Sequence, residues 1–146
     1  MKSIIKVTSL LSLLLSTLTS HAGGVTFYPH PNPALPFSMA TQVGDVVYLS
    51  GQIGDKDGKL SADLATQAHQ VMLNIKLAGE SAGVGMDDIF KCLVMIEDMQ
   101  NWKAFSDIYV TYFDKNRLPA RSAFGADGLA LGAMFEVECM AYKEAK

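Results

Sequence analysis

The sequence predicts a single α+β domain in which two helices pack on one face of a mixed β-sheet. Segments with the two-residue period of strands alternate along the chain with two segments of helical period. Their order is β-β-α-β-α-β-β, and helices gathered on one face of a sheet are typical of the α+β class. No repeat or low-complexity stretch interrupts this order, so we expect one domain over residues 37–146.

The first two strands are predicted over residues 37–43 and 46–49. Gly44-Asp45 lies between them and is a tight hairpin signal. Four prolines precede them, and proline cannot donate the backbone hydrogen bond that a strand ladder needs. We therefore expect residues 23–36 to be an extended lead-in that does not pair continuously.

The clearest helix is predicted over residues 63–82, because its apolar residues recur at helical spacing. Ser61 or Asp63 can cap its start, and Gly83 can end it. A long strand is expected over residues 89–96. A second helix is then expected over residues 101–116, with Trp102, Phe105, Tyr109 and Tyr112 on one side.

The last two strands enclose a glycine-rich turn. Arg121 opens the first of them, residues 125–132 turn the chain, and residues 133–142 form the second. The sheet face away from the helices still needs cover. In a chain this short, a partner subunit is the simplest way to supply that cover.

Residues 1–22 have the layout of a secretory signal peptide. Two lysines within the first six residues precede an uncharged stretch over residues 7–20, and small residues flank His21. A membrane anchor is the alternative, but the apolar stretch is shorter than the ~20 residues that a spanning helix needs. We therefore expect cleavage after Ala22, no membrane span in the mature chain, and a periplasmic or secreted protein.

Charge and cysteine content restrict the partners. Removing 22 residues, two lysines among them, leaves 124 of the 146 residues and moves the formal net charge from −3 to −5. An acidic domain with two arginines does not fit a phosphate backbone, so we expect no nucleic acid partner. Cys92 and Cys139 can form a bridge in an exported protein. Their apolar surroundings favour two buried free thiols instead.

Arg121 and Glu136 are the candidate site residues. Each places a charge where a strand should be apolar, which is costly unless the charge has a partner. One explanation is a structural ion pair at a sheet edge. The other is a binding site, in which the guanidinium holds a small carboxylate bidentately and the glutamate positions or deprotonates a water.

The remaining sequence offers little other chemistry. His30 and His69 are the only histidines outside the predicted signal peptide, and His69 is expected on a solvated or half-buried helix face. Two histidines and two separated cysteines do not have metal-ligand spacing, so we expect no metal. The glycines at 51, 54 and 58 are not followed by a helix at the distance of a dinucleotide-binding motif.

The chain resembles the RidA family, also called the YjgF/YER057c/UK114 family. The motifs Ser50-Gly51-Gln52 and Pro119-Ala120-Arg121 are specific when they occur together at this spacing. The resemblance extends from about residue 36 to residue 142. It is carried by residues 47–54, 67–76, 82–89, 95–99, 109–113, 119–122 and 136–138.

The resemblance implies a chorismate-mutase-like fold, a homotrimer with sites in the clefts between subunits, and hydrolysis of 2-imino or enamino acids to 2-oxo acids and ammonia. Arg121 matches the family's carboxylate-binding arginine, and Glu136 matches the glutamate that orients the water. Ser50 matches a small hydroxyl residue of the pocket. No cofactor is expected, because a protonated imine is already electrophilic and only a positioned water is needed.

The chain differs from the family pattern at three site positions. Phe37 stands where relatives often have Tyr, Ala123 where they often have Cys, and Asp107 where Asn is common. The lost hydroxyl at Phe37 keeps open a second hypothesis, a module that binds small carboxylates or a partner without turnover. Ribonuclease activity is a third hypothesis, which the acidic charge and the lack of a catalytic histidine pair disfavour.

Overall fold

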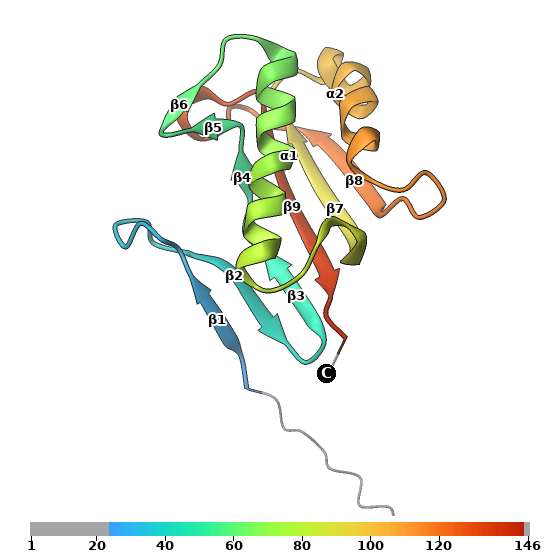
Figure 1. Ribbon diagram of the computed structural model, residues 1–146. Coiled ribbons are helices and arrows are strands. Elements are labelled where there is room, and N and C mark those ends of the chain that lie inside the picture. The colour runs from blue at the N-terminus through green and yellow to red at the C-terminus, as the bar shows by residue number, and fades with distance from the viewer. Residues whose placement is uncertain (1–23, 145–146) are drawn as a thin grey trace, which may run out of the picture.

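A computed structural model describes residues 24–144 of the chain, so the predicted signal peptide lies outside the described residues. Two helices lie on one face of a mixed sheet (Figure 1). Along the sheet the strand order is β1-β2-β3-β9-β7-β8, with β4 also paired to β9. These strands are β1 (Thr26–Pro29), β2 (Ser38–Val43), β3 (Val46–Leu49), β4 (Gln52–Ile53), β7 (Ile89–Ile96), β8 (Ala120–Gly125) and β9 (Phe135–Tyr142).

The predicted α+β class and element order are confirmed. Neighbouring strands run antiparallel except β7 and β8, which are parallel. The connection between these two is the second helix, as a parallel pair requires a crossover. The helices are α1 (Leu64–Ser81) and α2 (Trp102–Tyr109), and α2 continues as a 3₁₀ turn over Val110–Tyr112.

Helix α1 begins and ends where the sequence indicates. The Asp63 carboxylate accepts a hydrogen bond from the backbone N–H of Thr66 at 2.7 Å, which satisfies one unpaired donor of the first turn. Gly83 ends the helix with φ +75°, a left-handed conformation that glycine adopts without a Cβ clash. A predicted tight turn is confirmed at Gly44, whose φ is +57°.

The lead-in is more structured than the prolines suggest. Residues Thr26–Pro29 form the edge strand β1 and pair with β2, and the register shifts at Pro29. The short segments β4, β5 (Asp55–Lys56) and β6 (Lys59–Leu60) were not predicted either. Strands of two to four residues are too short to show a period, and a proline at the end of an edge strand costs no ladder bond.

The core lies between the helices and the sheet. Its largest fully buried side chains include Phe105 of α2, Phe135 of β9 and Met72 of α1. Gln67 is also buried, and both ends of its amide are satisfied: it donates to Ser61 O at 2.8 Å and accepts from Met134 N at 2.6 Å. This amide therefore ties α1 to the chain just before β9, which carries Glu136.

The opposite face of the sheet has no helix over it in the described chain (Figure 1). Strand β9 alternates between the two faces, so its odd-numbered residues are buried under the helices and its even-numbered residues face away. Large apolar residues are exposed on the uncovered side, with Tyr48 of β3 at 41% and Phe124 of β8 at 47%. Within residues 24–144, no helix has the length and hydropathy that a membrane crossing needs.

The cysteines form a disulfide, contrary to the expectation of two free thiols. Cys92 of β7 and Cys139 of β9 lie directly opposite each other in adjacent strands and are bonded. Their apolar surroundings were interpreted correctly, since both are buried. Their spacing of 47 residues gave no sign that strand register would bring them together.

Removing this disulfide is expected to destabilise the fold. A bridge that closes a loop of 47 residues restricts the unfolded chain, which corresponds to about 4 kcal/mol in the chain-entropy description. The double variant Cys92→Ala/Cys139→Ala should lose about that much free energy of unfolding in urea. Reductant should weaken the native protein and leave the double variant unchanged. A native unfolding curve that reductant does not move would contradict the bridge.

Candidate functional site

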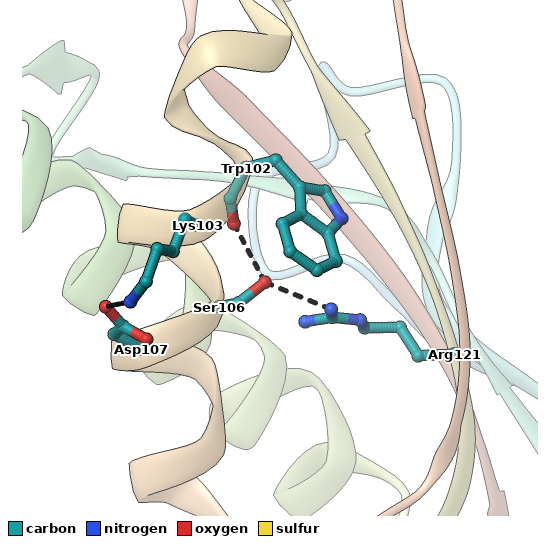
Figure 2. Close-up of polar contacts among 5 residues, drawn as sticks. All are labelled: Trp102, Lys103, Ser106, Asp107 and Arg121. Carbon is teal, nitrogen blue, oxygen red and sulfur yellow. Dashed lines mark hydrogen bonds and ion pairs between the residues drawn. The ribbon is translucent and has the colours of Figure 1, made fainter.

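Arg121 lies on β8, and its side chain packs against α2. Its Nη2 donates a hydrogen bond to Ser106 Oγ at 3.0 Å. Its Cζ is 4.8 Å from the Tyr109 ring centroid and 5.5 Å from that of Trp102, both within cation–π range. Figure 2 shows the guanidinium reaching from the strand to the helix, beneath the indole.

The spacing of α2 explains this arrangement. Trp102, Ser106 and Tyr109 are separated by four and three residues, so they share one face of the helix. Ser106 Oγ donates to the carbonyl oxygen of Trp102 at 2.8 Å, which leaves its lone pairs for Arg121 (Figure 2). About two turns of helix thus hold the guanidinium without a carboxylate.

Tyr109 keeps its proton beside this cation. Its side chain is buried, and its hydroxyl is a buried group without a hydrogen-bond partner in the described residues. Burial raises the pKa of Tyr109 to about 12, and the charge of Arg121 opposes that rise. Tyr109 is therefore neutral at physiological pH and does not compensate the charge of Arg121.

The structural ion pair considered for Arg121 does not form in the described chain. The ion pairs within residues 24–144 are Lys76–Glu80 and Lys103–Asp107, both on helices. Arg121 lies on β8 and Glu136 on β9, which are consecutive strands in the sequence. In the sheet, however, β7 lies between β8 and β9. The guanidinium therefore keeps donors that are not used by a carboxylate of its own protomer.

Glu136 lies on β9 in a confined environment. It is half-buried, opposite Ile53 of β4 and Met95 of β7. Its carboxylate lies close against Gly51, where an added Cβ would clash with Glu136 Oε1. Burial, and then the charge of Glu138, raise the pKa of the Glu136 carboxyl above its ordinary value of 4.5. These effects make Glu136 a better proton acceptor than an ordinary carboxylate.

The side chains of Arg121 and Glu136 point to opposite faces of the sheet. Arg121 is in register with Cys92 on β7, and Cys92 faces the helices. Glu136 is in register with Met95, three positions further along the same strand. Successive strand residues alternate faces, so residues three apart point in opposite directions. One protomer therefore does not present Arg121 and Glu136 to the same ligand.

The other predicted site residues divide between these two places. Ser50 follows β3, donates to Ser38 O at 2.6 Å, and precedes the Gly51 that contacts Glu136. Phe37 is exposed and packs edge-on against His30, with centroids 5.5 Å apart. Neither residue contacts Arg121 among the described interactions.

Of the three positions that differ from the family pattern, only Ala123 shares a strand face with Arg121. Ala123 is two residues along β8, on the same face, and packs against the core. Asp107 instead pairs with Lys103 at 2.7 Å on the exposed side of α2 (Figure 2). The residue that contacts Arg121 is Ser106, which the sequence reasoning missed. The helical spacing from Trp102 was the signal that could have found it.

The described residues contain no group of three or more histidine, cysteine or acidic side chains that could hold a metal ion. His69 is exposed on α1, as predicted, and its Nδ1 lies 2.9 Å from the Tyr112 hydroxyl. The predicted catalytic and binding roles stay predictions at this point.

The chain is similar to known proteins in sequence and in fold. The family model described as Endoribonuclease L-PSP matches residues 28–143. A RutC family protein of Pyrococcus horikoshii is 34% identical over 117 residues, which cover 78% of this chain and 92% of the relative. A protein of Dermatophagoides farinae named 2-iminobutanoate/2-iminopropanoate deaminase is 34% identical over 111 residues, covering 74% of this chain and 86% of that one.

Solved structures give the same result. RidA from the Antarctic bacterium Psychrobacter sp. PAMC 21119 superposes with a TM-score of 0.71 at 30% identity, and the match covers 81% of this chain and 97% of that one. The chain therefore belongs to the RidA (YjgF/YER057c/UK114) family, to which the Endoribonuclease L-PSP model corresponds.

The Ser106 contact can be tested by stability. Ser106→Ala should lower the free energy of unfolding by about 1–2 kcal/mol, because a half-buried guanidinium loses a hydrogen bond. Asp107→Ala is the matched control on the same helix, since it removes only an exposed ion pair worth about 0.5 kcal/mol. Equal losses in the two variants, measured by chemical denaturation, would contradict the assigned contact.

Proposed function

We propose that this protein hydrolyses reactive 2-imino and enamino acids to 2-oxo acids and ammonia. The observation that carries the proposal is the guanidinium of Arg121, which is held in place by α2 and has no carboxylate partner in the described chain. The relative from Dermatophagoides farinae that is named for this activity supports it.

Arg121 is assigned to the substrate carboxylate. Its guanidinium has five N–H donors, and Ser106 uses one Nη2 donor. A planar fork of the remaining donors fits a carboxylate bidentately. Ser106, Trp102 and Tyr109 restrict the side chain before the ligand arrives, which reduces the ordering cost of binding.

Glu136 is assigned to the water. The water oxygen adds to C2 of the protonated imine as Glu136 accepts a water proton, which forms a carbinolamine. Glu136 returns that proton to the nitrogen. As the C–N bond breaks and ammonia leaves, Glu136 accepts the proton of the carbinolamine hydroxyl, which becomes the carbonyl of the 2-oxo acid, and this proton then passes to ammonia. The raised pKa of Glu136 suits this exchange, because a base is most effective when its pKa approaches the working pH. The reaction needs no metal or redox cofactor.

A complete site requires two copies of the chain. Arg121 and Glu136 leave opposite faces of the sheet, so a ligand that meets both must lie between protomers. The apolar residues on the uncovered face, including Tyr48 and Phe124, provide surface for such an assembly. We assign the assembly to a homotrimer, with Arg121 from one protomer and Glu136 and Ser50 from the next.

Export is part of the proposal. The segment over residues 1–22 has the layout of a signal peptide. The buried Cys92–Cys139 disulfide supports an oxidising compartment, because such bonds are rare in proteins of the reducing cytosol. The two observations are independent, since one concerns the leader and the other the centre of the sheet.

A binding module without turnover is the second candidate. The observation that favours it is the separation of the two charges, because the carboxylate-binding group is fully assembled within one protomer while Glu136 lies elsewhere. Such a protein would bind small carboxylates at Arg121 and consume no imine. Thermal shifts with pyruvate, in the absence of imine hydrolysis, would select it.

The proposed activity can be measured with 2-iminopropanoate generated by an amino acid oxidase, through the rate of semicarbazone formation. Arg121→Ala should lower kcat/KM by a factor that corresponds to about 2–4 kcal/mol of transition-state binding, because the substrate carboxylate loses charge-assisted hydrogen bonds. Glu136→Gln should lower kcat while binding of pyruvate persists, because the amide cannot accept the proton.

Matched controls are available in the chain. Arg117→Ala removes the other arginine, which donates to the backbone at Asp87, and Glu80→Gln removes a carboxylate on the outer side of α1. Both should keep native rates. Native protein that does not accelerate imine loss, or full activity in Arg121→Ala, would refute the proposal.

A further inference from the structure

The exposure of Trp102 is not explained by its contact with Arg121. Trp102 is the only tryptophan of the chain, and the residue is 42% exposed although its ring centroid lies 5.5 Å from the Arg121 Cζ. Tyr109 packs on the same guanidinium but is buried, so Trp102 is the exposed one of the two rings. The exposed indole therefore offers apolar surface directly beside the carboxylate-binding group.

Met99 is a second exposed apolar residue at the start of α2. It lies three residues before Trp102, in the 3₁₀ turn Met99–Asn101 that leads into α2, and it is 43% exposed. Its side chain lies on Gly125 at the end of β8, where an added Cβ would be 3.0 Å from Met99 Cγ. Because Gly125 has no side chain, the Met99 side chain can pack directly against its backbone. We call Trp102 and Met99 together the apolar shelf.

The position of Arg121 indicates which ligand would cover the shelf. Because the Arg121 Cζ lies 5.5 Å from the indole centroid, a carboxylate bound by the free donors of Arg121 would bring its adjoining carbon and substituent near the indole. An alanine-derived substituent is a single methyl group and covers little of the shelf. A branched aliphatic or aromatic substituent would cover much more, and apolar area removed from water is the main source of such selectivity.

We propose that Trp102 is a specificity-determining residue and that the site prefers 2-imino acids with large apolar side chains over 2-iminopropanoate. This inference rests on the proposed function, since it uses the same arginine and the same reaction. It adds the substrate class, and it assigns to Trp102 a direct contact with the substrate side chain.

Binding is the first test, because the single tryptophan is its own probe. The probes are pyruvate and 4-methyl-2-oxopentanoate, the 2-oxo acids with a small and a large side chain, and the readout is tryptophan emission. The larger acid should bind about tenfold tighter and change the emission, and Arg121→Ala should abolish the change. Equal affinity, or no change of emission at saturation, would overturn the inference even if the protein has no imine hydrolase activity.

Kinetics are the second test. The imines of alanine and leucine are compared in the native protein, Trp102→Ala and Trp102→Phe. The native ratio of kcat/KM should favour the leucine imine, and Trp102→Ala should reduce that ratio about tenfold, mainly through KM. Trp102→Phe should retain most of the preference, because a ring remains.

The control separates this role from general damage. Leu73→Ala removes an apolar residue of α1 that is also 42% exposed, and it should leave the ratio unchanged. A Trp102→Ala variant that lowers both rates equally would overturn the inference and assign Trp102 to positioning Arg121 or to contact between protomers. If the native protein hydrolyses neither the alanine imine nor the leucine imine, the proposed function is refuted instead. The fluorescence titration with the two 2-oxo acids then decides the inference on Trp102.

Discussion

The contact between Arg121 and α2 is the interaction on which the site depends. A half-buried guanidinium is costly to desolvate, and in most proteins a carboxylate compensates it. Here a hydroxyl at 3.0 Å and two aromatic rings hold it, so its position is fixed while its charge stays available. Helix α2 achieves this with residues at helical spacing, and the crossover between parallel strands β7 and β8 sets α2 over β8.

Strand alternation imposes the second constraint. Arg121 is in register with Cys92, Glu136 is in register with Met95, and an odd number of residues separates those two positions on β7. The two charges therefore point to opposite sides of one sheet, whatever their side-chain rotamers. The proposed reaction, which uses both residues, therefore requires two protomers, and the uncovered apolar face is the surface available for their contact.

The long elements were predictable because they show a period over eight or more residues, as in α1, β7 and β9. Strand β1 was missed because prolines obscure so short an edge strand. The disulfide and the Ser106 contact depend on tertiary placement, which brings together residues 47 and 15 positions apart. Arg121 and Glu136 were recognised from the sequence as charges in apolar strands. Their separation by β7 could not be predicted, because the order of strands in the sheet differs from their order in the sequence.

The most direct test of a shared site is complementation between two inactive variants. Arg121→Ala and Glu136→Gln would be unfolded together, refolded as an equal mixture, and assayed for hydrolysis of 2-iminopropanoate. If each site takes Arg121 from one protomer and Glu136 from another, random assembly restores about a quarter of the sites. Activity near a quarter of the native value is the predicted result. A mixture no more active than the separately refolded variants would contradict the account.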